Sequence, residues 1–458
     1  MSKIRSFRVG RVTVYLRSRT WYLRYCENTR RQQVRAGVDR DSSRRLAAQV
    51  NAQLESGAPA ACSFEQISIP ELRRRWLDHH EHVLRSSVTT ISRYRSASEH
   101  LINFISNVQP VRYASQFREA NAEAFVRHLR QLEVSPNGHP RAARRRLRDK
   151  GIKYVLEVSR TLFGFALKRR HLPPYSENPF TIIQIDRIPV EDAKPIIIFD
   201  VAQERQFLEA CDDWQLPIFA TLMLTGLRPG ELTHLLLPED VDLQEGWLAV
   251  RNKPDLGWQV KTRNERRVPL MPELKDVLAI VANERGSGPL FLRRDGANVS
   301  AYRFAHATRE QLRAELDRRI ARRQVAGDSP SRAQKRQMCQ RLWFEMGAVF
   351  EDRLRIEFMK LTCSIGLPQL TAPKTLRHLF ATNLQEVNID PLIRNQLMGH
   401  VAAGEGRSSG PLGMTGIYSH ASPATIRRQM TEAMQGRPAM DVLRRWLERR
   451  AAEGIVSA

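Results

Sequence analysis

Cysteine is rare in this sequence, and long apolar runs are absent from it. The 458 residues include five scattered cysteines: Cys26, Cys62, Cys211, Cys339 and Cys363. Their odd number and wide spacing indicate reduced thiols and exclude a disulfide framework or a cysteine zinc site. No apolar stretch approaches the roughly 20 residues that cross a bilayer, and the opening MSKIRSFRVG lacks the apolar core of a signal peptide. We therefore expect a cytoplasmic protein with no membrane partner.

Lysine is also scarce, although the chain is strongly basic. Only 11 of its 73 basic residues are lysines, and the formal net charge is +24. Arginine grips a phosphate through two parallel hydrogen bonds, but a genome whose codon usage favours arginine gives the same bias. A charge of this size predicts attraction to polyanions. Because a membrane is disfavoured, we expect nucleic acid to be the partner.

The length suits two or three domains, and a hydrophobic content of 42% is enough for real cores. Residues 1–57 predict a small α+β module, because apolar and polar residues alternate along 12–16 and 21–25 as they do in strands. A third strand is expected over 33–36, followed by a helix that Asp41, Ser42 and Ser43 cap. The segment 56–61 is typical of a linker.

Residues 63–185 predict an all-helical domain, with helices near 69–82, from 89 onwards, and over 120–132 and 153–170. Between the last two lies a dense basic run, RAARRRLRDK, which is either a solvated surface or a contact to a DNA backbone. The proline-containing segment 178–194 is typical of a second linker.

Residues 195–436 predict a third domain of mixed structure. We expect helices near 201–211 and 217–224, strands over 247–250, 259–261 and 267–270, and a long charged helical stretch within 301–362. Residues 437–458 predict a helical tail, which either covers its own domain or docks on a neighbouring subunit. The expected fold class is therefore mostly α with small β-sheets (α+β).

Two arginine-containing motifs stand out in the third domain. TGLRPGEL places Glu231 three residues after Arg228, on the same helical face, where it can brace the guanidinium group. TLRHLFATNL contains Arg377, and Lys374 precedes it at the same spacing. Two cations on one helical face repel each other unless an anion lies between them. Taken alone, each pair is more often an ordinary surface feature.

Three further motifs supply a histidine, a tyrosine and a lysine. LMGHV contains His400, TGIYSH contains Tyr418, and QVKTRNERRVPL contains Lys261. A single histidine or tyrosine of this kind is usually a packed or surface residue, and a strand lysine usually faces solvent. The order of the whole set changes that interpretation.

In this order the motifs resemble the signature of the tyrosine recombinase (phage integrase) family. TGLR-x-x-E is followed by a lysine in a strand hairpin, then by LRH-x-x-AT, LMGH and IYSH. The resemblance covers roughly residues 63–436, and residues 1–57 also resemble the small three-stranded arm-binding domain of many integrases. It implies an arm-type module, a helical core-type DNA-binding domain and a catalytic domain that act on double-stranded DNA with specific recombination sites.

The resemblance implies a role for each matching residue. Arg228 and Arg377 match the two arginines that hold the scissile phosphate, and Glu231 matches the acidic position that supports the first of them. Tyr418 matches the nucleophile, which forms a 3′-phosphotyrosyl link and releases a 5′-hydroxyl. Such a reaction needs cations that neutralise the nonbridging oxygens in the transition state, and arginines meet that need.

The three remaining matches concern phosphate binding and proton transfer. His400 matches the residue that assists at the phosphate, and Lys261 matches the lysine that protonates the leaving 5′-oxygen. Lys374 stands where the family usually has a histidine. With an ordinary pKa of about 10.4 a lysine is a poor base at neutral pH, so we assign Lys374 to phosphate binding. The group that accepts the Tyr418 proton stays open.

A covalent link to tyrosine retains the energy of the phosphodiester, so rejoining needs no ATP, and the sequence has no GxxxxGK[ST] phosphate loop. It also has no convincing carboxylate cluster, so we expect neither a cofactor nor a metal ion. The family implies a homotetramer on DNA, with accessory DNA-bending proteins as further candidate partners. We expect the protein to be associated with the nucleoid of a bacterium.

Three alternative functions stay open. A type IB topoisomerase shares the fold and the tyrosine chemistry, a silent DNA-binding protein shares the fold alone, and a metal-dependent nuclease would need carboxylates that the sequence does not show. His400 and Tyr418 are 18 residues apart, which is longer than usual in the family, and the Gly- and Ser-rich segment between them predicts a flexible loop. The arm-like module favours integration or excision over inversion or resolution.

Overall fold

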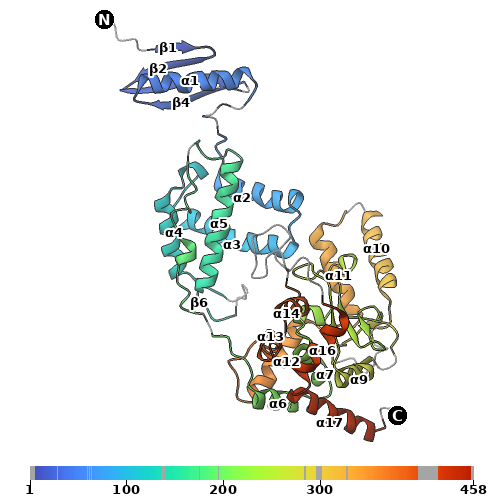
Figure 1. Ribbon diagram of the computed structural model, residues 1–458. Helices are drawn as coiled ribbons and strands as arrows, with labels where there is room; N and C mark the ends of the chain where they lie inside the picture. Colours follow the sequence, from blue (N-terminus) through green and yellow to red (C-terminus); the bar gives the residue numbers. More distant parts are fainter. Residues whose placement is uncertain are drawn as a thin grey trace. The chain divides into compact units, whose positions relative to one another are not determined.

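The computed structural model describes residues 6–27, 29–58, 60, 62, 64–135, 141–174, 176–193, 195–282, 285–294, 302–325, 329–400 and 421–454. The chain divides into two compact units, Met1–Lys194 and Pro195–Ala458 (Figure 1). Within the first unit, residues 12–62 and residues 67–188 form separate hydrophobic clusters. No helix among the described residues is long and apolar enough to cross a membrane.

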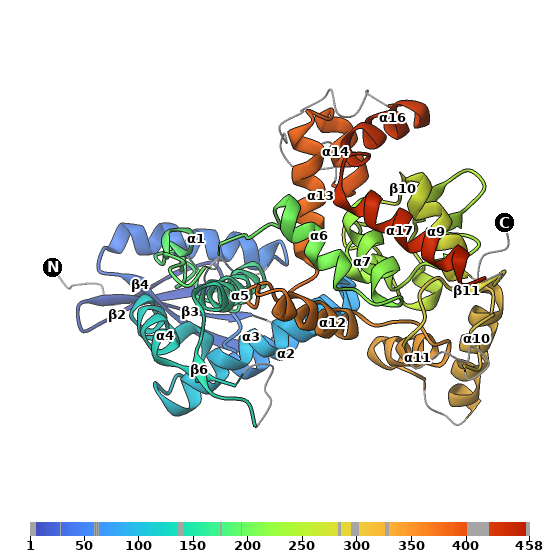
Figure 2. The ribbon, with the colours of Figure 1, turned by 90° about the horizontal axis from the view of Figure 1, so that it is seen from below.

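The N-terminal module is an antiparallel sheet in the order β1-β2-β3-β4, with α1 across one face (Figures 1 and 2). Its elements are β1 (Ser6–Val9), β2 (Val12–Arg17), β3 (Thr20–Glu27), β4 (Arg30–Gly37) and α1 (Arg40–Glu55). The predicted alternation is confirmed, because Val12, Val14 and Leu23 are fully buried beneath α1. β1 was not predicted from the sequence. The predicted helix cap, at residues 41–43, lies too late in the chain, because Asp39 caps α1 by accepting a hydrogen bond from the backbone of Ser42.

The rest of the first unit is helical, as predicted. Its helices are α2 (Ile69–Asp78), continued by a π-helical turn (His79–Val83), α3 (Val88–Asn107), α4 (Glu119–Gln131) and α5 (Asp149–Lys168), with short 3-10 turns at Ala114–Gln116 and Ile185–Arg187. Part of the basic run 141–150 forms the two-residue strand β6 (Arg145–Arg146), paired with β5 (Glu133–Val134). Phe180 and Ile185 are buried in the helical core, so part of the segment expected to be a linker is packed.

The second unit combines small sheets with many helices. Its strands are β7 (Leu236–Leu237), β8 (Val241–Asp242), β9 (Trp247–Val250), β10 (Arg266–Pro269) and β11 (Gly288–Pro289), in sheets ordered β10-β9-β8 and β11-β7. Its helices are α6 (Val201–Glu209), α7 (Gln215–Thr225), α8 (Pro229–Leu232), α9 (Pro272–Ala282), α10 (Arg309–Val325), α11 (Arg332–Glu345), α12 (Glu351–Ser364), α13 (Lys374–Glu386), α14 (Pro391–Met398), α16 (Pro423–Met434) and α17 (Pro438–Ala452). The predicted fold class, mostly α with small sheets, is confirmed.

One predicted strand, over 259–261, is wrong. The chain between β9 and β10 is a loop, 251–265, with a 3-10 turn at Pro254–Leu256 and an isolated bridge between Lys253 and Trp258. Lys261 lies in a turn of this loop. Apolar and polar residues also alternate in this loop, and that alternation led to the strand prediction. The side chain of Asn252 instead binds the backbone at Val260 and Arg263, and this part of the described loop pairs with no neighbouring strand.

Helix α7 lies at the centre of the second unit, and every one of its residues is buried. α13 packs along it, and α14 and α16 pack beside α13 (Figure 2). α17 belongs to the same core, because Met440, Leu443 and Trp446 are buried in it and the helix packs against α6 and α9. Arg437, just before α17, binds the fully buried carboxylate of Glu204. In this structure the tail therefore covers its own unit.

Candidate active site

Glu231 lies at the centre of a group of arginines in the second unit. Its carboxylate accepts hydrogen bonds from the backbone and the guanidinium of Arg228, at 2.9 and 2.7 Å, and from two nitrogens of Arg266, at 3.1 and 2.6 Å. Nη1 of Arg377 lies 4.0 Å from the same carboxylate. We call Arg228, Arg266 and Arg377 the arginine cluster. Three positive groups face one negative group, so the cluster keeps an excess of positive charge.

The end of α7 explains why the first motif contains glycine. Gly226 terminates α7 in the left-handed conformation, with φ of 63°, which favours glycine. A Cβ added there would lie 2.2 Å from the ring of Phe380 on α13, so only glycine lets these helices approach so closely. The carbonyl of Gly226 then accepts a hydrogen bond from Nη1 of Arg377 at 2.5 Å.

The end of α14 joins the other parts of the site. The last carbonyls of a helix have no partner within it, and cations near them are favoured by the helix dipole. Here the carbonyl of Leu397 accepts from Nε of Arg266 at 2.7 Å, and that of Met398 accepts from Arg377. The carbonyl of Gly399 accepts from the hydroxyl of Thr262 at 3.1 Å. Three consecutive carbonyls thus bond to β10, α13 and the loop 251–265, directly before His400.

Gly399 is required for that arrangement. It adopts φ of 61°, and a Cβ added there would lie 2.8 Å from Nη1 of Arg266. A larger residue would displace the buried guanidinium that binds Glu231. This close contact explains the glycine that precedes His400 in LMGHV.

The excess positive charge perturbs the titration of the site. Burial raises the pKa of Glu231, but hydrogen bonds and charge from Arg266 and Arg228 outweigh it, and the net pKa is lowered. Burial, then the charge of Arg228, lowers the pKa of Arg377 to about 10, although Glu231 opposes this. Repulsion between Arg228 and Arg377 thus adds to the effect of burial, and an anion bound between them would relieve it.

His400 lies within the same field. Its pKa is lowered by burial and by the charges of Arg377, Arg228 and Arg266. The imidazole is therefore neutral at neutral pH in the free protein, and a neutral imidazole can accept a proton.

The structure brings Arg228, Glu231, Arg377 and His400 together, as the sequence motifs suggested. Lys374 lies one turn before Arg377 at the start of α13, and its side chain is exposed. Burial, followed by the charges of Lys374 and Arg377, lowers the pKa of the neighbouring His378.

Tyr418 lies outside the described residues. The described chain resumes at Ala421, which packs against the core of the unit.

Two lysines of the loop 251–265 differ sharply in their surroundings. Lys253 is 1% exposed and forms an ion pair of 2.6 Å with the buried Asp240. Lys261 is exposed, and its neighbour Thr262 binds the carbonyl of Gly399. The loop therefore has one buried lysine, paired with Asp240, and one exposed lysine whose neighbour in sequence contacts Gly399.

Sequence reasoning missed Arg266, although a signal for it exists. Along β10, Arg266 and Val268 are buried while Arg267 is exposed. An arginine in phase with the buried positions of a strand must have an internal partner. The sequence analysis began the strand one residue later and so did not notice this phase.

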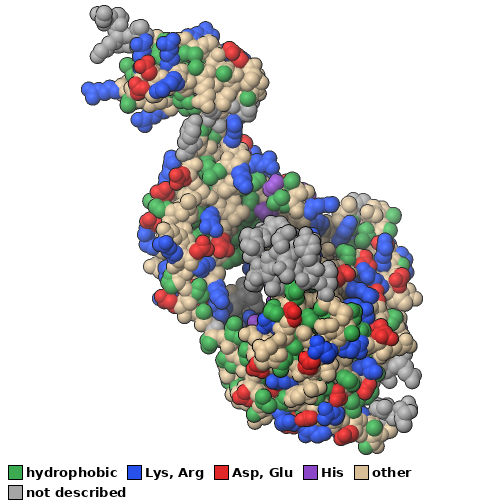
Figure 3. Space-filling model, in the orientation of Figure 1, with side chains coloured by type: hydrophobic (Ala, Val, Ile, Leu, Met, Phe, Trp, Pro, Cys, Tyr) green, Lys and Arg blue, Asp and Glu red, His purple; other side chains and the backbone are tan. Residues whose placement is uncertain are grey.

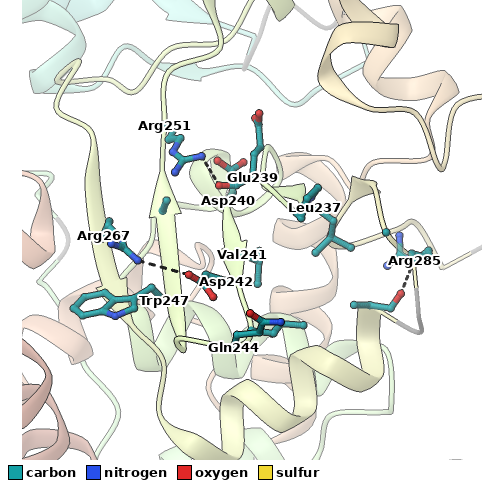
Figure 4. A pocket seen from close by; sticks show the side chains of 15 residues that line it. Leu237, Glu239, Asp240, Val241, Asp242, Gln244, Trp247, Arg251, Arg267 and Arg285 are labelled. Carbon is teal, nitrogen blue, oxygen red and sulfur yellow. Dashed lines mark hydrogen bonds and ion pairs between the residues drawn. The ribbon is translucent and has the colours of Figure 1, made fainter.

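A cavity of about 450 Å³ opens elsewhere in the unit, and none of the predicted catalytic residues lines it (Figure 4). Arg251 and Arg267 lie on one side of it and Arg285 on the other, with Asp240 and Asp242 between them. The residues that the sequence motifs predict lie at the arginine cluster and not in this cavity, so the cluster is the candidate active site.

Comparison with solved structures places this geometry in a known fold. An integrase of the transposon Tn1549, in complex with transposon right end DNA, is 17% identical, with coverage of 80% of this chain and 99% of its own and a TM-score of 0.50. A lambda integrase dimer bound to a COC′ core site is 15% identical, with coverage of 85% and 92% and a TM-score of 0.41. The XerA recombinase is 17% identical, with coverage of 80% and 98% and a TM-score of 0.31.

No protein-family model and no curated protein matches the sequence. The likeness to the Tn1549 integrase shows that the chain has the fold of the tyrosine recombinases. The resemblance that the motifs suggested is therefore confirmed at the level of the fold.

Proposed function

We propose that this protein is a site-specific DNA recombinase that cuts and rejoins double-stranded DNA through a covalent link to Tyr418. The observation that carries the proposal is the arginine cluster, in which three guanidinium groups share the single carboxylate of Glu231. The net positive charge, the buried guanidinium of Arg377 and the adjacent neutral His400 suit a phosphodiester better than a neutral ligand.

In the proposed reaction the phenolic oxygen of Tyr418 attacks phosphorus, and the bond between phosphorus and the 5′-oxygen breaks. Arg228 and Arg377 stabilise the charge on the nonbridging oxygens, and Lys261 gives a proton to the leaving 5′-oxygen. His400 is a candidate acceptor for the Tyr418 proton, because its lowered pKa keeps it neutral. Attack by a 5′-hydroxyl from a second duplex reverses these steps and restores the phosphodiester without ATP.

The position of Tyr418 in the chain supports this assignment. Tyr418 is three residues before Ala421, which packs on the core of the unit, and α16 begins at Pro423. Three peptide units span at most about 11 Å. α16 packs against α13 and β10, which carry Arg377 and Arg266. The covalent chain thus ties the tyrosine to elements that hold the arginine cluster.

The N-terminal module is a proposed second DNA-binding surface. On the face of its sheet opposite α1, Tyr15 and Tyr22 stack with ring centroids 5.8 Å apart, and the exposed Arg24 and Arg35 flank them through the strand register. Arginine side chains project from this module in the space-filling view (Figure 3). A basic, aromatic sheet face suits the backbone and grooves of DNA.

The contribution of this sheet face to DNA affinity can be measured from the dependence of binding on salt concentration. Arg24→Ala and Arg35→Ala should each weaken binding to a long duplex and make the dependence of affinity on salt shallower. Arg45→Ala, on the exposed side of α1, is the matched control and should change neither. Equal effects of all three changes would remove the proposed face.

The experiment that tests the function is a duplex with a nick near the cleavage point, which prevents rejoining. Incubation with a chelator should still trap the protein covalently on the DNA. Tyr418→Phe should abolish the adduct while DNA binding survives. Cleavage that leaves no adduct and that the chelator abolishes would favour a metal-dependent nuclease, and DNA binding with neither cleavage nor an adduct would favour a silent DNA-binding protein.

The proposed assembly is a homotetramer on two duplexes, with accessory DNA-bending proteins as candidate partners. Sedimentation with a two-duplex junction should give four protomers per complex. Relaxation of a supercoiled plasmid that lacks any recombination site, by a single protomer, would favour a type IB topoisomerase instead.

A further inference from the structure

Helices α10 and α11, which lie between β11 and α12 in the chain and are together called the insertion below, contact the loop that contains Lys261. Arg309, the first residue of α10, binds both carboxylate oxygens of Asp255 in the loop, at 2.8 and 2.6 Å. It also lies 3.6 Å from the carboxylate of Glu239 and donates to the carbonyl of Asn252 at 3.4 Å. The pKa of Asp255 is lowered, chiefly by the hydrogen bonds of Arg309. One arginine therefore fixes the loop to the insertion.

Apolar packing reinforces the same attachment. Leu256, at the tip of the loop, is 1% exposed and packs among residues of α10 and α11. Its carbonyl accepts a hydrogen bond of 3.1 Å from the indole of Trp343 on α11. Gly257 approaches α11 so closely that an added Cβ would lie 2.7 Å from Cys339. The tip of the loop is thus part of the core of the insertion.

The side chain of Asn252 holds the turn that contains Lys261. The side chain of Asn252 accepts from the backbone of Val260 at 2.9 Å and donates to the carbonyl of Arg263 at 3.0 Å, so that it holds the residues on both sides of the turn. Thr262 then binds Gly399 of the site. Because Arg309 donates to the carbonyl of Asn252, the two attachments are connected.

The insertion also contacts the half of the site that contains Arg228. His234, two residues after α8, stacks on Trp258 of the loop, with centroids 4.9 Å apart, and meets Trp343 edge-on at 4.6 Å. Its Nδ1 lies 2.7 Å from the carbonyl of Gly230, between Arg228 and Glu231 in sequence. A single aromatic group therefore joins α8, the loop and α11.

We propose that α10 and α11 position Lys261 for proton transfer to the leaving oxygen, with Arg309 and Trp343 as positioning residues. The proposal rests on the proposed function. It assigns the insertion a role inside the unit, in the geometry of one catalytic group.

The test compares two nicked substrates that differ in one atom at the cleaved bond. In the ordinary substrate the bond between phosphorus and the 5′-oxygen breaks, and the oxygen leaves as a hydroxyl after it takes a proton. In the other substrate a sulfur replaces this bridging oxygen. A thiolate, whose conjugate acid has a pKa of about 8.5, leaves without a proton donor. Loss of the donor therefore slows cleavage of the first substrate selectively.

Arg309→Ala should slow cleavage of the oxygen substrate by about 10- to 100-fold and change the rate with the sulfur substrate by less than about twofold. Trp343→Phe keeps an aromatic ring but removes the N–H that donates to the carbonyl of Leu256. It should also slow cleavage of the oxygen substrate selectively, but less than Arg309→Ala does. Arg322→Ala, which changes an exposed arginine in the last turn of α10, is the matched control and should leave both rates unchanged. Asp255→Asn offers a milder break of the ion pair if Arg309→Ala folds poorly.

Equal slowing of both substrates by Arg309→Ala would overturn the proposal, because it would indicate general disruption of the site. No effect on either substrate would also overturn it. Lys261→Ala is the reference and should show the largest selectivity for sulfur. If it slows both substrates alike, the role of Lys261 and the positioning proposal fail together, while adduct formation by the unchanged protein still supports recombinase chemistry.

Discussion

The two halves of the candidate active site are held in place in different ways. Glu231 organises the arginine cluster from within, through ion pairs to Arg228 and Arg266 that are largely shielded from water. The loop 251–265 is held from outside, by Asn252 on one side of Lys261 and by Arg309 of the insertion on the other. The first half is a compact electrostatic unit, and the second depends on a separate structural element. Changes in the two halves should therefore have different consequences.

The largest expected effect comes from breaking the first half. Glu231→Ala leaves three buried or half-buried guanidinium groups without their carboxylate, and we expect the free energy of unfolding to fall by about 3–5 kcal/mol. Urea unfolding of the purified protein measures this. Glu432→Ala removes the partner of Arg428 in an exposed pair and should change stability by less than about 1 kcal/mol. Similar losses for both variants would mean that Glu231 does not organise the cluster.

Removal of one arginine should affect chemistry more than folding. Arg228→Ala takes away a charged donor from the proposed phosphate site, and we expect adduct formation to slow by about 10²- to 10³-fold while DNA affinity stays within a few-fold. Single-turnover trapping on the nicked substrate gives the rate, and gel shifts give the affinity. Arg267→Ala, which changes an exposed arginine on β10, is the control. An unchanged rate for Arg228→Ala would exclude it from the site.

His234 joins the two halves and should make their packing sensitive to pH. Burial lowers the pKa of His234 to about 4, against about 6.5 in an unfolded chain. Its contribution to stability is therefore complete above pH 6.5 and is lost as the pH falls towards 4. Relative to His234→Gln, the unchanged protein should lose on the order of 2 kcal/mol of stability between pH 7.5 and pH 5. A stability difference that stays constant with pH would contradict this.

The smallest expected change in stability lies in the second half. Asn252→Ala removes two hydrogen bonds around the Lys261 turn, and we expect about 1 kcal/mol of destabilisation. Cleavage of the ordinary substrate should nevertheless slow by about tenfold or more, because the turn loses its shape. Asn264→Ala makes the same chemical change elsewhere in the loop and should do neither. A large loss of stability with an unchanged cleavage rate would contradict the expected difference between the arginine cluster and the loop.

The same contrast explains what the sequence could predict. Arg228 and Glu231 are three residues apart, so helical geometry alone predicts their pairing, and the motif order led to the prediction that Arg377 and His400 belong to the same site. Arg309 and Asp255 are 54 residues apart, and no local pattern links them. Nor does a local pattern distinguish the buried Lys253 from the exposed Lys261, because Asp240 supplies the difference through tertiary packing. The strand expected over 259–261 failed because the side chain of Asn252 bonds the backbone at Val260 and Arg263.

The elements of the fold were also predictable only where the sequence pattern was local and long enough. Long helices such as α3 and α5 were predicted because their apolar periodicity persists over 20 residues. The four-residue strand β1 was missed, because so short a segment contains too few alternations to be recognised. Arg266 was missed because the predicted strand began at Arg267, and its partners Glu231 and Leu397 lie far away in sequence.

The most direct test of the whole account is to identify the residue that is joined to DNA. The complex trapped on the nicked duplex would be digested with a protease and a nuclease, and the modified peptide sequenced by mass spectrometry. We predict a single nucleotide-bearing peptide with the modification on Tyr418, at the 3′-phosphate. A modification on another residue, or a link to a 5′-phosphate, would contradict the proposed mechanism.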